Sequence, residues 1–511
     1  MRSASEQTGV RVVPVFGVML AGAFVAFLNQ TLINVALPQI MDRMHISATT
    51  GDWLTTIYLL VNGIVIPITA YLIARFTTRQ LYITAMSLFF IGTVICGLSP
   101  SFGIMLVGRV VQAAGAGVLM PVMMNAVFRL FPPERRGMAM GIFGIALNFA
   151  PAIGPTLSGW IVQNGSWRTL FYIIMPIAFV DLILAIFLMR NVTTTSRPKF
   201  DGLGAALSTI GFGGLLYGFS EAGSVGWGGL DVIVSLAVGA ASLVALVFWQ
   251  LSTREPILEF RIFRYPMYTL TTIINVIVSV ALFAGVILMP MYMQNVRGFS
   301  PLLSGLMLLP GGILMGIMSP ITGKLFDLMG ARWLAVIGLA ITAATTYCLT
   351  RLGTDTTFLY CTVVYTLRMF GMSILMMPLM TAGLNELPLR LNPFGTAMLN
   401  TLRMVAGAVG TALLVTVMTD RAKVHVQSIM LAQHIAPTDK LAEAHALAQG
   451  TVMGINDAFM VAVAASVAAF IMAFFVRRTS PQPDFLEERQ ERANRHPVDA
   501  LQESELVVGK D

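Results

Sequence analysis

Charged side chains are scarce in this sequence: they make up 11% of its 511 residues, whereas hydrophobic residues make up 56%. Soluble domains carry about 25% charged residues, so the composition excludes an ordinary soluble protein. Long apolar runs recur from end to end, and the alternation typical of an outer-membrane barrel is missing. A backbone in lipid must close its own hydrogen bonds as helix. We therefore expect an all-α membrane protein.

Cysteine, histidine and enzyme motifs are also rare or missing. Cys96, Cys348 and Cys361 fall within apolar spans at no metal-ligand spacing, so no metal, cofactor or disulfide is expected. No Walker loop, G-x-S-x-G or H-E-x-x-H motif occurs, and the acids are too scattered to form a catalytic cluster, which argues against an enzyme. The net charge of +7 lies in turns rather than in one patch, so no nucleic-acid partner is expected.

Fourteen apolar runs approach the roughly 20 residues that a membrane-spanning helix needs. The predicted spans cover residues 13–38, 52–75, 81–99, 102–128, 138–162, 168–190, 203–221, 231–251, 268–290, 301–322, 333–351, 357–383, 394–418 and 455–476. The even number puts both termini on one side, where the turns hold most of the arginine and lysine residues. The positive-inside rule then predicts cytoplasmic termini in a plasma membrane, the inner membrane of a bacterium.

An internal repeat divides the chain. The segment from Arg109 to Pro121, followed by G-M-A-M at 137–140, is echoed from Arg368 to Pro378, followed by G-T-A-M at 395–398. Two homologous halves of this kind are typical of transporters with a site near the membrane midplane. The predicted parts are a six-helix half at 1–200, an inserted helix pair at 201–267, a second six-helix half at 268–478 with an outer loop at 419–454, and a disordered cytoplasmic tail at 479–511. In the outer loop, the stretches on either side of Pro437 are candidates for two short helices on the membrane surface.

Four motifs carry a family resemblance. G-R-V-V-Q-A-A-G-A-G at 108–117 resembles the fourth-helix motif of the major facilitator superfamily, and A-P-A-I-G-P-T-L-S-G at 150–159 resembles the fifth-helix signature of its drug:proton antiporters. With L-N-Q-T-L-I-N-V-A-L-P at 28–38 and F-P-P-E-R-R-G at 131–137, they are similar to the fourteen-span EmrB/QacA branch. The resemblance covers nearly the whole chain. It implies a multidrug exporter that exchanges amphipathic small molecules, cationic or neutral, for protons.

Two other functions stay open. One is a dedicated exporter of a single metabolite or of Na⁺ with the same fold, and the other is a receptor or scaffold that transports nothing. The expected partners are lipophilic small molecules, protons and the lipid bilayer, and no sequence feature bears on a periplasmic adaptor.

Ionisable residues inside the spans are the candidates for proton coupling, because a charge in a bilayer costs roughly 3 kcal/mol. The resemblance implies that Arg109 takes part in proton handling; the alternative is a structural arginine bonded to main-chain carbonyls. Many relatives have an aspartate where this chain has Asn29, so the proton carrier must lie elsewhere. The candidates are Asp181, Glu221 and Asp457, although Asp457 is also placed to cap the start of the last helix.

Polar and polarisable residues on the repeated helices are the candidates for the substrate path: Asn29, Gln30, Asn34, Gln112, Met123, Asn148 and Arg403. Gln112 shares one helix face with Arg109 at a spacing of three residues. The alternative for the amides is hydrogen bonding between helices, and for methionine it is core filling. Arg403 is either a counter-charge to a buried acid or a residue that reaches an aqueous cavity.

Two segments are candidates for conformational change. In the fifth span, Pro151, Gly154, Pro155 and Gly159 predict a bent helix with close packing, and the resemblance implies that this segment lies at the contact between the halves. In the second half, G-K-L-F-D-L-M-G-A-R at 323–332 places Asp327 at a helix end on the cytoplasmic side. The matching segment of the first half has no aspartate, so any charge latch should rely on Asp327.

Overall fold

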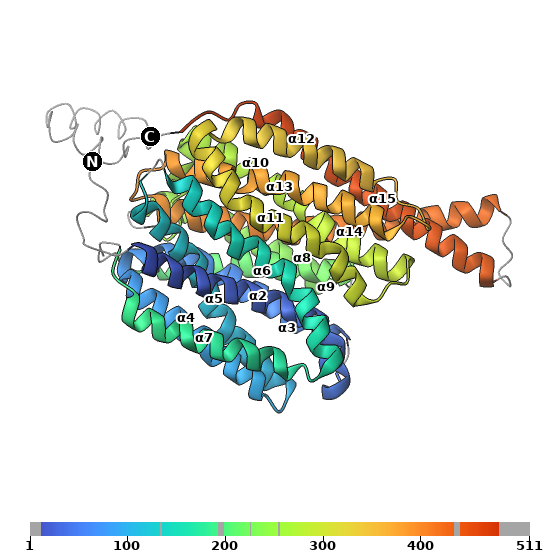
Figure 1. The fold of residues 1–511 in the computed structure, drawn as a ribbon, viewed down its shortest axis with the longest axis horizontal. Coiled ribbons are helices and arrows are strands. Elements are labelled where there is room, and N and C mark those ends of the chain that lie inside the picture. The colour runs from blue at the N-terminus through green and yellow to red at the C-terminus, as the bar shows by residue number, and fades with distance from the viewer. Residues whose placement is uncertain are drawn as a thin grey trace.

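Fourteen long helices make up the fold of this computed structural model, which describes residues 12–46, 48–132, 135–192, 199–224, 226–253, 256–433 and 440–479. No strand occurs in these ranges. The helices are α2 (Val12–Met44), α3 (Ala48–Arg75), α4 (Thr78–Leu98), α5 (Phe102–Leu130), α6 (Arg136–Asn164), α7 (Arg168–Leu188), α8 (Gly202–Ser224), α9 (Leu230–Ser252), α10 (Pro266–Met291), α11 (Pro301–Met329), α12 (Ala331–Leu349), α13 (Phe358–Glu386), α14 (Asn392–Ala432) and α15 (Lys440–Ala473), with short helices η2 (Phe260–Arg264) and η3 (Tyr292–Val296) (Figure 1).

Each predicted span coincides with one of the helices α2 to α15. Thirteen helical segments of the described chain are long and apolar enough to cross a membrane, and α6 adds a shorter apolar segment at Arg136–Leu147. The predicted all-α membrane fold is therefore confirmed.

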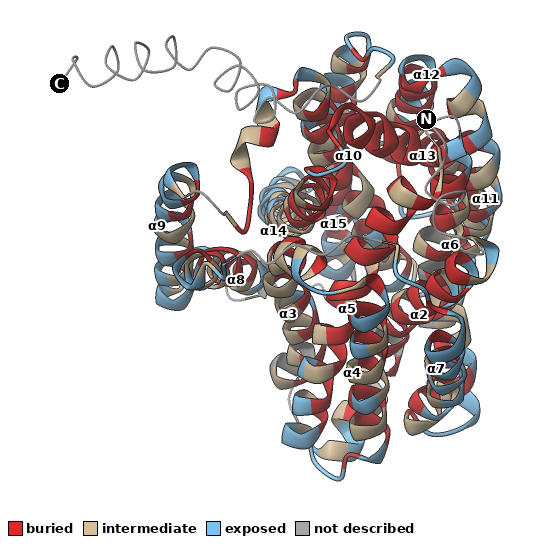
Figure 2. Ribbon diagram, turned by 90° about the vertical axis from the view of Figure 1, so that its left-hand side faces the viewer, coloured by how far each residue is buried: buried red, intermediate tan, exposed pale blue. Residues whose placement is uncertain are grey.

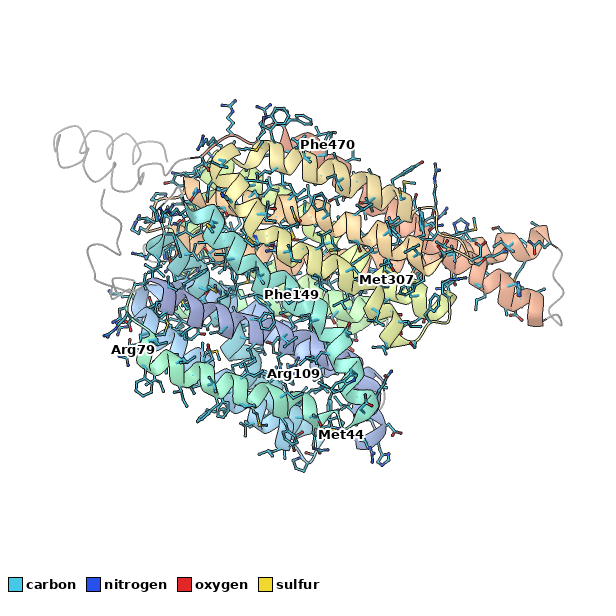
Figure 3. The ribbon with its side chains drawn as sticks, viewed as in Figure 1. Met44, Arg79, Arg109, Phe149, Met307 and Phe470 are labelled. Carbon is cyan, nitrogen blue, oxygen red and sulfur yellow. The ribbon has the colours of Figure 1, made fainter. Side chains whose placement is uncertain are left out.

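The helices form two bundles and a flanking pair. Helices α2 to α7 pack together, as do α10 to α15, and α6 against α11 is the most extensive contact between the two sets. Helices α8 and α9 stand at one side, where α8 meets α3 and α14 (Figure 2). Phe149 of α6 lies at the boundary between the bundles, whereas Arg109 lies inside the first (Figure 3).

Glycine brings α6 and α11 into close contact. A Cβ atom on Gly141 would lie 2.8 Å from the Cα of Pro320, and one on Gly144 would lie 2.7 Å from the Oγ of Ser319. Only a residue without a side chain allows this approach of two helix backbones. The small-residue stripe of α6 therefore fixes how closely the two bundles meet.

The segment expected as an outer loop is mostly helical. Helix α14 continues to Ala432 and α15 begins at Lys440, so the two helices form a hairpin that projects beyond the bundles (Figure 1). Residues 419–432 contain neither glycine nor proline, so nothing in the sequence ends the helix where the apolar span ends. Both helices thus continue out of the apolar region instead of lying along a surface. Pro437 falls outside the described residues.

Candidate substrate cavity and buried charges

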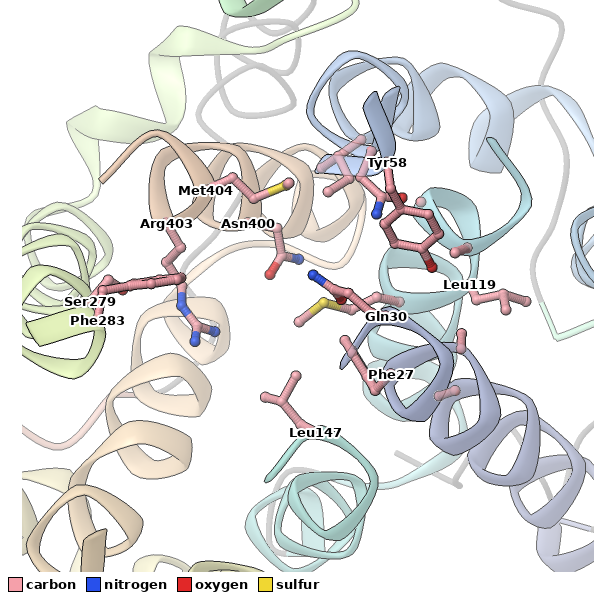
Figure 4. A pocket seen from close by; sticks show the side chains of 17 residues that line it. Phe27, Gln30, Tyr58, Leu119, Leu147, Ser279, Phe283, Asn400, Arg403 and Met404 are labelled. Carbon is pink, nitrogen blue, oxygen red and sulfur yellow. The ribbon is translucent and has the colours of Figure 1, made fainter. Parts of the chain in front are cut away.

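A cavity of about 210 Å³ lies between the two bundles (Figure 4). Helices α2, α3, α5 and α6 form one side, and α10 and α14 form the other. The lining residues are Ala23, Ala26, Phe27, Gln30, Tyr58, Asn62, Ile66, Ala116, Gly117, Leu119, Met120, Leu147, Ser279, Phe283, Asn400, Arg403 and Met404. A mostly apolar wall with a few convergent polar groups is typical of a small-molecule site. The residues from α2, α3 and α5 fall near the middle of their helices, so the cavity lies at mid-depth.

Arg403 is the one charged residue among those that line the cavity. Its guanidinium points from α14 into the space between the bundles (Figure 4). Its Nη1 lies 3.7 Å from the Sδ of Met380, and its Nε is buried without a hydrogen-bond partner in the described chain. Arg403 was expected either to offset a buried acid or to reach a cavity, and its side chain reaches the cavity.

Arg109 is held behind the cavity wall by neutral partners. Its Nε donates to the carbonyl oxygen of Leu54 at 3.1 Å, and its Nη1 donates to Asn29 Oδ1 at 3.1 Å and to Gln112 Oε1 at 2.7 Å. The guanidinium carbon lies 4.1 Å from the ring centre of Tyr58, which itself lines the cavity. The arginine therefore combines a main-chain bond with contacts to two amide side chains and to a tyrosine that lines the cavity.

The second arginine of the repeat has a matching environment. Arg368 is fully buried; its Nε donates to Thr346 Oγ1 at 3.0 Å, and its Nη2 donates to the carbonyl oxygen of Ala281. In the first bundle Gln112 Nε2 donates to Thr93 Oγ1 at 2.7 Å. In the second bundle, α13 therefore bonds to a threonine of α12 directly through its arginine. In the first bundle, α5 bonds to a threonine of α4 through Gln112, which also binds the arginine.

Asp181 is buried inside the first bundle and bonds to Tyr82. The Tyr82 hydroxyl lies 2.7 Å from Asp181 Oδ2 and 2.8 Å from the carbonyl oxygen of Val18. A phenol has one proton and a carbonyl oxygen only accepts. The hydroxyl can therefore make both hydrogen bonds only if it donates to the Val18 carbonyl and accepts from Asp181. Asp181 can donate only when its carboxyl group is protonated. The other carboxyl oxygen, Oδ1, is buried without a partner in the described chain, which also fits a protonated acid.

The other two acids are not part of the cavity wall. Glu221 is half-buried near the end of α8, in the flanking helix pair. Asp457 lies in the middle of α15 rather than at a helix start, so it caps no helix. Its Oδ2 accepts hydrogen bonds from Arg421 Nε at 2.7 Å and His425 Nε2 at 2.9 Å. These three side chains form a partly exposed cluster within the hairpin. Neither acid is among the residues that line the cavity.

The remaining substrate-path candidates divide into four groups. Gln30 lines the cavity, and Asn29 and Gln112 bind Arg109. Met123 is fully buried in the first bundle and is not part of the lining, whereas Met120 one turn before it is. The side chains of Asn34 in α2 and Asn148 in α6 lie outside the described structure.

Several lining residues do not stand out in the sequence. Tyr58, Asn62 and Ile66 lie one turn apart on a single face of α3, and Asn400 precedes Arg403 by three residues in α14. Polar residues spaced three or four apart within an apolar span share one helix face, and this spacing could have identified Tyr58 with Asn62 and Asn400 with Arg403. Tyr82 gives no such signal, because its role depends on contacts with α2 and α7.

At one end the two bundles are joined by polar contacts. Asp327 of α11 accepts hydrogen bonds from the backbone N–H groups of Gly137 at 2.9 Å and Met138 at 3.0 Å. These groups belong to the first turn of α6, where the helix dipole favours an anion. Nearby, Arg136 Nη1 donates to Asn385 Oδ1 of α13 at 3.1 Å. Asp327 thus lies where a latch between the bundles would act.

The segment around Gly154 packs against α2 of its own bundle. A Cβ atom on Gly154 would overlap the Oγ1 of Thr31 in α2, and Ser158 Oγ donates to the carbonyl oxygen of Leu32 at 2.6 Å. Gly159 is buried beside them, and the backbone at Pro151 and Pro155 is helical, although both proline side chains lie outside the described structure. The contacts at Gly154 and Ser158 are with α2.

Metal-binding groups do not gather in the described chain. No three His, Cys, Asp or Glu side chains in these ranges lie close enough to hold a metal ion. The three cysteines are free, and Cys96 and Cys361 are buried.

Comparisons with known proteins agree with this architecture. Residues 19–411 match the model of the Major Facilitator Superfamily. The uncharacterized MFS-type transporter YhcA of Bacillus subtilis (strain 168) is 46% identical over 93% of this chain and 95% of its own length. The lincomycin resistance protein LmrB of Listeria monocytogenes is 40% identical over 93% of this chain and 99% of its own length. The probable multidrug resistance protein EmrY of Escherichia coli is 29% identical over 63% of this chain and 64% of its own length.

The fold also matches solved transporter structures. The human organic anion transporter MFSD10 superposes with a TM-score of 0.65 at 13% identity, covering 91% of this chain and 99% of the other. The proton:xylose symporter XylE superposes with a TM-score of 0.60 at 14% identity, covering 92% of this chain and 96% of the other. At these identities the likeness concerns the fold.

Proposed function

The chain belongs to the Major Facilitator Superfamily, and from this premise we propose that it exports amphipathic small molecules in exchange for protons by alternating access. It is a multi-pass membrane transporter with relatives named for lincomycin and multidrug resistance. The observation that carries the proposal is the cavity between the bundles, together with a buried acid and a buried arginine in the first bundle. A site between two halves is what alternating access requires.

The contacts at Asp327 and Arg136 support a conformation closed at one end. The helix ends there carry Arg75 in α3, Lys324 in α11 and Arg332 in α12, and the positive-inside rule assigns such basic ends to the cytoplasm. The described termini lie at the same end, opposite the α14–α15 hairpin (Figure 1). We therefore interpret this conformation as closed toward the cytoplasm, with both termini cytoplasmic.

Asp181 is the acid that we propose as the proton carrier. It lies near the middle of α7 and is buried, and the bonding of Tyr82 to both Asp181 and Val18 fits the protonated state. A carboxyl group without a cationic partner holds its proton while buried and releases it when water enters. Glu221 and Asp457 lie in the flanking pair and in the hairpin, and neither lines the cavity.

Helix α2 supplies the proposed link between proton and substrate. Its Val18 carbonyl bonds to Tyr82, its residues Ala23 and Gln30 line the cavity, and its Asn29 binds Arg109. Loss of the Asp181 proton would turn the Tyr82 hydroxyl from the Val18 carbonyl toward the carboxylate. Proton release would thus change what holds α2, the helix that faces the substrate.

Transport in proteoliposomes under an imposed pH gradient tests the proposal. The full chain should accumulate a fluorescent amphipathic dye while the gradient lasts, and a protonophore should abolish the accumulation. Asp181→Asn should lose accumulation but keep downhill movement of the dye, because an amide can still donate to Tyr82 as the protonated acid does. Glu221→Gln and the matched control Asp457→Asn should stay coupled to the gradient.

The outcomes separate the alternatives. Transport that persists unchanged after the gradient collapses contradicts antiport. Normal coupling in Asp181→Asn together with its loss in Glu221→Gln assigns the proton to Glu221. Transport of one compound without competition by unrelated amphipaths indicates a dedicated exporter. If nothing is transported and replacement of Arg109 has no effect, a receptor or scaffold is the better description.

A further inference from the structure

The charges at the cavity carry one sign. Arg403 is the one ionised side chain in the lining, and no aspartate or glutamate is among the residues that form the wall. The only hydrogen-bond acceptor that the described chain gives its guanidinium is the thioether of Met380, 3.7 Å from Nη1, and a thioether is a weak acceptor. Its buried Nε has none. A buried donor without a partner is costly, so this site favours an acceptor that arrives with the ligand.

A second positive charge lies behind the wall. Arg109 contacts the ring of Tyr58, whose side chain faces the cavity. The hydrogen-bond partners of Arg109 are Asn29, Gln112 and the carbonyl of Leu54, all of them neutral. No carboxylate therefore offsets this charge within its hydrogen-bonding shell. In a medium of low dielectric such charges act over longer distances than in water, so both cations favour a negative charge in the cavity.

Apolar side chains cover other parts of the wall. Phe27 and Leu147 lie across the space from Arg403, and Phe283 lies beside it (Figure 4). Asn400 adds an amide one helical turn before Arg403. The cavity therefore has an apolar part that suits a hydrocarbon body and a cationic part that suits a head group rich in acceptor oxygens.

From this arrangement we propose that the substrates are amphipathic acids, with a carboxylate or similar anionic head group on Arg403 and an apolar body on Phe27, Leu147 and Phe283. This inference rests on the proposed function and names the substrate class of the same cavity. It replaces the cationic or neutral class that the family resemblance implies. An organic cation would face Arg403 with no acid in the lining to offset the repulsion.

Three probes with one skeleton test the head group: 4-phenylbutyrate, 4-phenylbutanol and 4-phenylbutylamine. Their affinities are measured by titration calorimetry with the full chain in nanodiscs, and the heats from empty nanodiscs are subtracted. The wild type should bind the carboxylate about tenfold or more tightly than the alcohol, as expected for a hydrogen bond to a charged group, and should bind the amine most weakly.

Variants of Arg403 locate the effect. Arg403→Gln should reduce the preference for carboxylate over alcohol to about one, while the affinity for the alcohol, which reports an intact cavity, changes little. Arg403→Lys should keep part of the preference, because it keeps the charge without the planar fork. The matched control Arg351→Gln removes an exposed arginine of the same half and should leave the preference unchanged. Phe283→Ala should weaken all three probes alike.

Three results would overturn the inference: an amine bound as tightly as the carboxylate, an unchanged preference in Arg403→Gln, or no binding of phenylbutyrate at millimolar concentration. These results are distinct from failure of the proposed function. If dye accumulation follows the pH gradient but the amine is the preferred probe, antiport stands and the substrate class is wrong. If the carboxylate preference holds without gradient-driven transport, the binding assignment stands and antiport is wrong.

Discussion

Replacing Asp327 by asparagine should loosen the closed end of the transporter. The carboxylate accepts two backbone N–H groups in the first turn of α6, where an anion also interacts favourably with the helix dipole. An asparagine side chain accepts through one oxygen only and carries no charge. Hydrogen bonds to charged groups contribute about 1.5–3 kcal/mol. Because Asp327 is partly exposed, solvent screening reduces this contribution, and we expect a loss of about 1–2 kcal/mol.

This loss acts on the balance between two conformations. The contacts with Asp327 join α11 to α6 across the bundles, so they stabilise the conformation in which this end is closed. A loss of about 1–2 kcal/mol shifts the ratio of open to closed molecules about 5- to 30-fold toward the open form. Dye transport should slow as a consequence, because the closed conformation becomes harder to reach.

Spin labels on the two bundles can measure the shift. Phe76 follows α3 and is 42% exposed, and Met329 ends α11 and is 53% exposed, so cysteines introduced at these positions report the separation at the closed end. In Asp327→Asn the fraction of long distances should rise in double electron–electron resonance. Asp327→Glu should restore part of the short distance, and Asp355→Asn, which neutralises an exposed acid between α12 and α13, should change nothing. An unchanged distance distribution in Asp327→Asn would refute the latch.

The fold could be predicted largely from local sequence properties. Hydropathy locates the spans because a helix that crosses the bilayer must be apolar over about 20 residues. The paired Arg109 and Arg368 motifs indicate the repeat. The hairpin of α14 and α15 could not be found in this way. Hydropathy reports where a helix leaves the apolar layer, whereas the end of the helix depends on breakers, and residues 419–432 contain none.

The site was predictable only in part. Gln30 and Arg403 stand out because polar residues are rare in such spans, and both line the cavity. The bonding of Tyr82 to Asp181 joins α4 to α7 across 99 residues of sequence, and no local pattern encodes it. Asn29 shows a further limit: the sequence indicates that it carries no proton, but its bond to Arg109 depends on how α2 and α5 pack.

Two further substitutions test the packing and the proton relay. Gly141→Leu should open the same end as Asp327→Asn and destabilise the protein by about 1–3 kcal/mol, because its Cβ would lie 2.8 Å from the Cα of Pro320; Gly103→Leu, where a Cβ meets nothing within 4 Å, is the control. Tyr82→Phe removes the hydroxyl that bonds to both Asp181 and the Val18 carbonyl oxygen of α2. The free energy of unfolding should fall by about 1–3 kcal/mol, and the dye accumulated per unit of pH gradient should fall as well. A merely structural tyrosine would lower stability but leave that ratio unchanged, so stability and coupling must be measured on the same preparation. Intact coupling in Tyr82→Phe would separate Asp181 from α2 and remove the proposed link between proton release and the substrate cavity.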